Sequence, residues 1–221
     1  NMKTANPTTI EITDLVKDIK GKRIIDHVNL HLESGKITGL KGVNGSGKTM
    51  LMRLVCGLIT PTSGSIVING KRLGKDITFP ESVGILIENP AFLDAYSGFE
   101  NLKLLASIKH RIGPEEIRQT IARVGLDPDD KKKYRKYSLG MKQRLGIAAA
   151  VMEEPDIIIL DEPTNALDSD GVAMLKEILH DQRERGALVL ISCHDLPTLQ
   201  ELSDEIYLME SGALRPYEED D

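Results

Sequence analysis

A glycine-rich loop near residue 45 constrains the fold of this chain more than any other feature. Residues 42–49 read Gly-Val-Asn-Gly-Ser-Gly-Lys-Thr and fit the pattern G-x-x-x-x-G-K-[ST]. A segment with strand propensity, residues 36–40, precedes the loop, and a helical pattern, residues 48–56, follows it. In this context glycines let backbone N–H groups turn toward phosphate oxygens, and the helix N-terminus adds its positive dipole. The pattern therefore predicts a phosphate-binding loop at the carboxyl end of a β-strand.

The residues of this loop have different expected roles. Lys48 would bring a positive charge to the β- and γ-phosphates of a nucleotide, and the hydroxyl of Thr49 would ligate Mg²⁺. Four fixed positions occur by chance in about one chain in a hundred of this length, and the flanking strand and helix make an accidental match rarer still. The candidate ATP-binding residues of the loop are Gly42, Val43, Asn44, Gly45, Ser46, Gly47, Lys48, Thr49 and Met50.

Two carboxylates end a second apolar segment. Residues 157–160 read Ile-Ile-Ile-Leu, and Asp161 and Glu162 follow. Ligands of open α/β sheets bind at the carboxyl ends of strands, so Asp161 would hold the Mg²⁺ shell and Glu162 would act as general base. The plainer reading, two surface acids at a strand end, is as good for this segment alone. The phosphate-binding loop favours the catalytic reading.

The order of strand-like and helix-like segments predicts an α/β fold in one domain. Strands are expected at residues 9–15, 27–32, 36–40, 65–68, 83–87, 157–160, 188–192 and 205–209. Helices are expected at residues 48–56, 100–110, 114–124, 139–152, 170–185 and 197–202. We expect residues 1–87 and 155–221 to form the core, antiparallel in its first 35 residues. Residues 88–154 read as helical throughout and are expected to form an inserted lobe.

Four further stretches carry a resemblance to a known family. Residues 161–168 read DEPTNALD, residues 138–144 read SLGMKQR, residues 191–195 read ISCHD, and residues 61–66 read PTSGSI. Together with the phosphate-binding loop, and in their order along nearly the whole chain, these stretches resemble the ATP-binding cassette (ABC) ATPases. The resemblance implies a P-loop NTPase fold of the ABC type: a RecA-like parallel sheet core, an N-terminal antiparallel β part and an inserted helical subdomain.

The family resemblance also implies how the residues act. Two copies would form a head-to-tail dimer with each ATP between one phosphate loop and the signature segment of the other copy. That signature corresponds to Ser138, Leu139, Gly140 and Met141. His194 would contact the γ-phosphate beside the base Glu162, and Asp168 would link the two sites. Taken alone, Ser138 reads as an ordinary helix N-cap and His194 as a structural histidine.

The sequence departs from the family pattern at three places. Leu139 and Met141 stand where the usual signature has glycine and glutamine. Glu88 stands where the family has a glutamine that contacts Mg²⁺, and a carboxylate there could ligate the ion with one extra negative charge. Ile19 stands where an aromatic residue stacks on adenine, so we expect weaker base contact.

These residues together predict an ATP-hydrolysing subunit of a bacterial ABC transporter. The motifs most resemble the branch of bacitracin-resistance and lantibiotic-immunity exporters, so the cargo would be a peptide antibiotic or similar amphiphile. The expected cofactors are ATP and Mg²⁺, and the expected partners are a second copy and an integral-membrane permease on a separate chain. The alternative is a soluble ABC switch without transport, linked to assembly or to nucleic acid.

Charge and hydropathy set the expected surroundings of the chain. The net charge of −6 and the lack of tryptophan argue against a nucleic-acid partner. The basic run at residues 131–136 reads as a solvated loop, with contact to anionic headgroups as the alternative. No segment reaches the roughly 18 apolar residues of a membrane span. The expected location is therefore the cytoplasm, peripheral on the inner face of the membrane.

Overall fold

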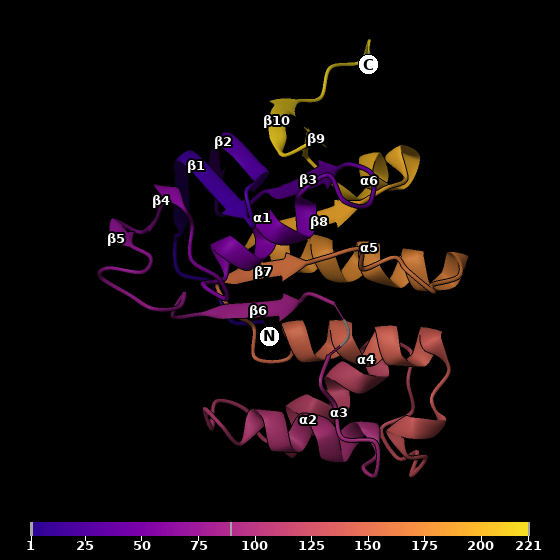
Figure 1. Cartoon of the computed structure of the whole chain (residues 1–221). Helices are drawn as coiled ribbons and strands as arrows, with labels where there is room; N and C mark the ends of the chain where they lie inside the picture. The colour runs from indigo at the N-terminus through magenta and orange to yellow at the C-terminus, as the bar shows by residue number, and fades with distance from the viewer. Residues whose placement is uncertain (1, 89, 221) are drawn as a thin grey trace.

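Two β-sheets and six α-helices build the part of the chain that the computed structural model describes, residues 2–88 and 90–220 (Figure 1). Residue 89, which follows the predicted site residue Glu88, lies outside the described residues. Each sheet has one face against α1, so the helix that follows the phosphate loop sits inside the core.

The larger sheet has six strands in the order β10-β9-β3-β8-β7-β6. Five of them are parallel, and β10 pairs antiparallel with β9. Strands β7 and β8 are buried on both faces, which explains why their sequences are continuous apolar runs. The bounds are β3 Ile37–Lys41, β6 Val83–Leu86, β7 Ile157–Leu160, β8 Leu188–Cys193, β9 Glu205–Glu210 and β10 Ala213–Pro216.

The smaller sheet is antiparallel, with the strand order β2-β1-β4-β5. Its strands are β1 (Thr9–Ile19), β2 (Lys22–Glu33), β4 (Ser63–Ile68) and β5 (Lys71–Arg72). Along the first half of β1 buried and exposed residues alternate, which is the pattern of a sheet with one face on a core. The expected antiparallel start of the chain is confirmed, and β4 extends it beyond residue 35.

Helix α1 (Lys48–Val55) packs between the two sheets. Its side chains Leu51, Met52 and Leu54 share one hydrophobic cluster with the antiparallel sheet and with alternate residues of β7, such as Ile159. The intervening residue Ile158 points to the opposite face. This sandwich fixes the start of α1, and with it the phosphate loop, at the carboxyl end of β3.

The remaining helices cover the other face and one side of the larger sheet. Their bounds are α2 Gly98–Ala106, α3 Pro114–Arg123, α4 Leu139–Val151, α5 Ser169–Glu184 and α6 Leu196–Leu202, with a 3₁₀ turn at Tyr134–Lys136. Figure 1 shows α2, α3 and α4 grouped below β6, with α4 nearest the sheet. None of the helices in the described residues is long and apolar enough to cross a membrane.

The expectation that residues 88–154 are helical throughout is wrong. Residues 90–96 form a loop before α2, because the side chain of Asn101 accepts a hydrogen bond from the Leu93 amide and donates to the Leu93 carbonyl. Further turns separate α2, α3 and α4. Strands β5 and β10 were not expected, because neither has an alternating apolar pattern.

Candidate active site

The phosphate loop joins β3 to α1 in a conformation that needs glycine at two positions. Gly47 has φ of 109°, in the left-handed region that other residues avoid. A Cβ on Gly42 would lie 2.5 Å from Ser46 Oγ and 2.6 Å from the carbonyl oxygen of Met209, so only glycine fits. Within the loop the Ser46 amide donates to the Val43 carbonyl at 3.1 Å. Val43, Asn44 and Gly45 are exposed at its tip.

Lys48 of the phosphate loop forms an ion pair with Glu162, the second acid after β7. Lys48 Nζ donates to Glu162 Oε1 at 2.6 Å, and the two side chains are only 4% and 14% exposed. The other oxygen of Glu162, Oε2, lies 3.0 Å from His194 Nδ1. The structure thus brings together three residues that the sequence singled out from three separate segments.

Asp161, the first acid after β7, contacts Thr49 of the phosphate loop. Thr49 Oγ1 donates to Asp161 Oδ2 at 2.7 Å. The other oxygen, Asp161 Oδ1, accepts a hydrogen bond from Ser192 Oγ at 2.6 Å, and Ser192 Oγ in turn accepts from the Glu162 amide at 2.8 Å. Ser192 is fully buried and ties the end of β8 to both acids.

His194 stands at the solvent-facing side of this cluster, with 61% of its side chain exposed. The next residue, Asp195, caps α6 by accepting hydrogen bonds from the Thr198 hydroxyl and amide. The hydrogen bond from the Thr198 hydroxyl is the main reason that the pKa of the Asp195 carboxyl lies below its ordinary value, and the hydrogen bond from the Thr198 amide adds to the effect. This cap ties the start of α6 to the turn that carries His194.

Two residues of this cluster were not singled out from the sequence. Ser192 belongs to an apolar strand, and its place directly before Cys193 and His194 was the available signal. The side chain of Gln143, on α4, donates to the carbonyl oxygens of Glu162 and Pro163 at 3.2 and 3.0 Å. It therefore ties α4 to the backbone of the acid that faces Lys48.

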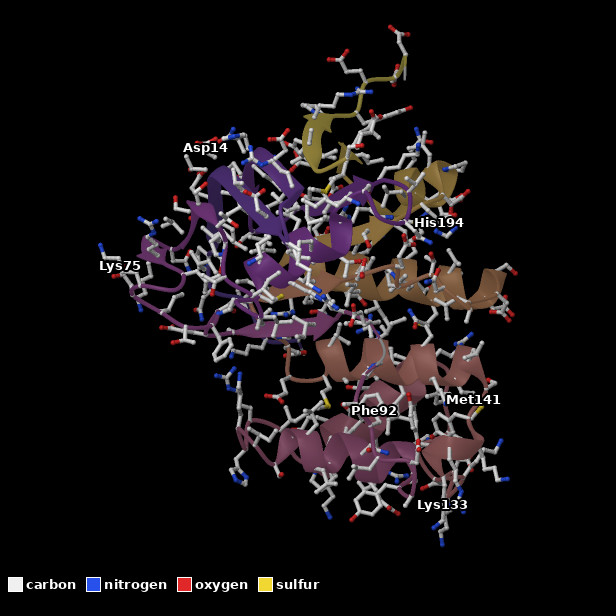
Figure 2. All side chains as sticks on the ribbon, in the orientation of Figure 1. Asp14, Lys75, Phe92, Lys133, Met141 and His194 are labelled. Atoms are coloured by element: carbon white, nitrogen blue, oxygen red, sulfur yellow. The ribbon has the colours of Figure 1, made fainter. Side chains whose placement is uncertain are left out.

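The signature residues lie at the start of α4. Ser138 is the N-cap of α4 and accepts from the Met141 amide at 3.1 Å, while Leu139 is 75% exposed. A Cβ on Gly140 would come within 3.0 Å of the Ala166 carbonyl. Figure 2 shows Met141 and His194 well apart on the molecule.

Asp168 follows the acidic strand end and begins α5. Its carboxylate accepts a hydrogen bond from the Gly171 amide at 2.8 Å and lies 3.4 Å from a guanidinium nitrogen of Arg144. Since Arg144 is on α4, this pair links the signature helix to α5. Asp168 itself is mostly exposed.

For two predicted site residues, Glu88 and Ile19, the structure shows contacts other than those with the acids and the phosphate loop. The carboxylate of Glu88, which leaves β6, contacts the guanidinium of Arg53 on α1. Ile19 is a half-exposed residue at the end of β1, beside the turn into β2. The hairpin that carries it approaches the loop through β2, because a Cβ on Gly47 would lie 3.1 Å from the Ile24 carbonyl.

The residues present fit a magnesium nucleotide. A threonine hydroxyl and a carboxylate are hard oxygen donors, and Mg²⁺ is usually held by one or two of these together with phosphate oxygens and water. No group of three His, Cys, Asp or Glu side chains among residues 2–88 and 90–220 forms a metal cage without such help. The buried Ser46 Oγ lacks a hydrogen-bond partner among the described atoms, inside the loop expected to bind phosphate.

Comparisons with known proteins point to one family. The family model described as ABC transporter matches residues 25–165. An uncharacterized ABC transporter ATP-binding protein of Bacillus subtilis, YybJ, is 48% identical over 95% of this chain and 96% of its own length. The bacitracin transport ATP-binding protein BcrA of Enterococcus faecalis is 39% identical over 93% of this chain and 67% of its own length.

Solved structures share the fold. The ATP-binding subunit of an ABC transporter superposes with a TM-score of 0.83 at 26% identity, covering 94% of this chain and 89% of the other. The dimeric structure of the bacterial ABC transporter cassette MJ0796 has a TM-score of 0.82 at 24% identity, covering 93% and 96%. The α/β P-loop fold of the ABC type, expected from the sequence, is confirmed.

Proposed function

We propose, since this chain belongs to the ABC transporter family of ATP-binding proteins, that it hydrolyses ATP to drive a permease on a separate chain. The contact that carries the proposal is the cluster of Lys48, Glu162 and His194. A cation from the phosphate loop, a carboxylate and an imidazole meet there with distances of 2.6 and 3.0 Å.

The ion pair of Lys48 and Glu162 supports a division of labour between binding and hydrolysis. In this structure the two charges neutralise each other in a site that is nearly closed to solvent. When a triphosphate binds, Lys48 would turn to the phosphate oxygens and leave Glu162 Oε1 to accept a proton from water. His194, on Oε2, would keep that carboxylate oriented toward the γ-phosphate.

Thr49 and Asp161 are the residues we propose to hold Mg²⁺. The ion would neutralise charge on the β- and γ-phosphate oxygens. Ser192 would keep the Asp161 carboxylate in place through its 2.6 Å hydrogen bond. Glu88 is proposed as a further ligand, which requires it to leave Arg53.

We propose that the working unit is a head-to-tail homodimer. The signature residues lie at the start of α4, and Figure 2 shows Met141 well apart from His194 within one copy. We therefore propose that the N-cap hydroxyl of Ser138 and the amide of Gly140 do not close the site of their own chain. A second copy could supply both to the γ-phosphate. Asp168, exposed beside the signature helix, would then lie at the dimer contact.

Residues 88–154 are proposed to be the lobe that transmits motion to the permease. Leu104, Leu105 and Ile108, at the end of α2 and just after it, are exposed, with 73% of Ile108 accessible to solvent. Leu93 and Tyr96 of the preceding loop are exposed as well. Apolar side chains gathered on one subdomain are typical of a protein contact.

Export of a peptide antibiotic or a similar amphiphile is the proposed transport reaction. The support is the resemblance to a bacitracin transport ATP-binding protein. The chain would then work on the cytoplasmic face of the membrane, held there by its permease. A host strain that co-expresses the chain and a candidate permease should tolerate more bacitracin than one that co-expresses Lys48→Ala and the same permease.

The first experiment combines phosphate release and mass in solution. The parent chain should release phosphate from Mg·ATP, and Glu162→Gln should bind ATP but lose turnover by about 100-fold or more. Light scattering of Glu162→Gln should show a shift from monomer to dimer with ATP and Mg²⁺. Hydrolysis by Glu162→Gln at the parental rate would contradict the assignment of the base, and a monomer at saturating ATP would contradict the dimer of isolated chains.

A further inference from the structure

The contact between Glu88 and Arg53 carries an inference about the metal dependence of the site. Arg53 lies on α1 four positions after Thr49, about one helical turn from the expected magnesium ligand. The carboxylate of Glu88 reaches the guanidinium of Arg53 from the loop that follows β6. The Arg53 side chain is partly buried, whereas the Glu88 side chain is mostly exposed.

The backbone places Glu88 at the edge of the nucleotide site. Strand β6 pairs in parallel with β7, so Leu86 lies opposite Leu160, and the Asp161 amide donates to the Leu86 carbonyl at 2.7 Å. Glu88 therefore leaves its strand beside the segment that carries the two acids. Its φ of 61° turns the chain sharply at this point.

The charges at this edge explain why Glu88 needs a partner. Three carboxylates, on Asp161, Glu162 and Glu88, belong to the neighbouring segments that follow β7 and β6. Glu162 is compensated by Lys48, and Asp161 receives two hydroxyl hydrogen bonds. The partner of Glu88 is Arg53. Without Arg53, Glu88 would add an uncompensated negative charge beside a site for a polyanion.

We infer that Arg53 is a positioning residue, which holds the Glu88 carboxylate against α1 and thereby sets how strongly nucleotide binding depends on Mg²⁺. The inference rests on the proposed function. When Arg53 is present, its positive charge screens the Glu88 carboxylate and holds it beside α1. Without Arg53, the freed carboxylate repels a metal-free triphosphate and attracts the metal complex.

The test measures binding in the absence of turnover. The dissociation constant of the non-hydrolysable analogue AMP-PNP is measured by calorimetry with excess Mg²⁺ and with EDTA, and the ratio of the two values is compared between variants. Arg53→Met should raise the ratio of the EDTA value to the Mg²⁺ value by about fivefold. Arg53→Lys keeps the charge and should stay near the parental ratio.

A second background separates this role from a merely structural one. In Glu88→Gln the carboxylate is absent, so adding Arg53→Met should change the ratio by less than about twofold. Arg118→Met is the matched control, because Arg118 also pairs with an acid, Asp129, but on the surface of α3. It should leave the ratio at the parental value.

The outcomes distinguish a positioning role of Arg53 from a merely structural one. An unchanged ratio in Arg53→Met, or an equal change when Glu88 is already glutamine, overturns the role of Arg53. Circular dichroism and the melting temperature test whether Arg53→Met is folded. If it is not, the ratio measured for Arg53→Lys is used instead. If the parent binds no AMP-PNP, the proposed function itself fails, which is a different result from normal binding with an unchanged ratio.

Discussion

The Nδ1 atom of His194 lies 3.0 Å from one carboxylate oxygen of Glu162, and Lys48 donates to the other oxygen at 2.6 Å. The Glu162 carboxylate is therefore held between a nearly buried cation of the phosphate loop and a histidine that solvent reaches. The two contacts act on the same group from opposite sides. Variants of each partner should consequently affect different steps.

Replacement of His194 by asparagine should slow hydrolysis and leave nucleotide binding nearly unchanged. The imidazole contacts the proposed base but is not part of the phosphate loop, so kcat should fall by about 100-fold while the dissociation constant of ATP changes little. Phosphate release and nucleotide titration measure the two effects. His180→Asn, on α5, is the control, and a kcat of His194→Asn near the parental value would contradict the role of His194.

Ser192→Ala should destabilise the protein and raise the Mg²⁺ concentration that ATP hydrolysis requires. The buried hydroxyl donates to Asp161 and accepts from the Glu162 amide, so its removal leaves both groups short of a partner, at a cost of about 1–3 kcal/mol. Urea unfolding measures the loss, and the Mg²⁺ concentration for half-maximal hydrolysis should rise. Ser203→Ala is the control, because the Ser203 hydroxyl is buried without a partner among the described atoms. Equal losses in the two variants would show that the Ser192 hydrogen bonds contribute nothing.

Ile19→Tyr should strengthen ATP binding. An aromatic ring at the end of β1 could stack on adenine, and such ring contacts contribute about 0.5–1.5 kcal/mol, or roughly two- to tenfold in affinity. Competition titrations with ATP and GTP measure the gain. Leu58→Tyr adds an aromatic ring at another half-exposed site and should have no effect. The same affinity in Ile19→Tyr and the parent would place Ile19 outside the base-binding surface.

Gly84→Ala should destabilise the fold through the contact between β6 and α4. A Cβ at this position would lie 1.7 Å from the carbonyl oxygen of Ala150, so strand and helix must separate. We expect a loss of about 3 kcal/mol in the free energy of unfolding. Gly113→Ala is the control, since its Cβ would meet only a flexible glutamate side chain at 3.4 Å. Urea unfolding with a similar midpoint for both variants would contradict the prediction.

The exposed antiparallel sheet should make a small contribution to pH dependence through His31. Its hydrogen bond with Glu11 is the main cause that raises the pKa of His31 above its ordinary value, and Glu33 adds to the effect. A raised pKa means that the folded state favours the protonated ring. The stabilisation is therefore complete below about pH 6.5 and is lost as the pH rises through the folded-state pKa.

The measurement for His31 compares free energies of unfolding. The difference between the parent and His31→Gln should be larger at pH 5.5 than at pH 9, by less than about 1 kcal/mol because the pair is exposed. A difference that is the same at both pH values would contradict a contribution from this histidine.

Much of the site could be predicted because its signals are local. The phosphate loop needs glycines, a lysine and a threonine within eight consecutive residues, and the acids Asp161 and Glu162 directly follow four apolar residues. Parallel strands bring their carboxyl ends to one edge, so the meeting of these two segments follows from the α/β pattern. The Thr49–Asp161 contact agrees with that expectation.

Other parts of the site depend on side chains that meet across long stretches of chain. No local pattern shows that Gln143 reaches the carbonyl of Glu162 or that Ser192 bridges the two acids. The two-residue strand β5 and the loop before α2 escaped prediction for a different reason. Strand β5 has no alternating apolar pattern, and the loop is held by hydrogen bonds between the Asn101 side chain and the Leu93 backbone.

Residue types at short spacing were therefore sufficient to predict the fold class, the phosphate loop, the acids and the family. The contacts of Glu88 with Arg53 and of Lys48 with Glu162 depend instead on how the chain folds. Neither contact follows from the spacing of these residues along the chain. The packing of α1 between the two sheets selects the partner, since it fixes where Lys48 and Arg53 stand.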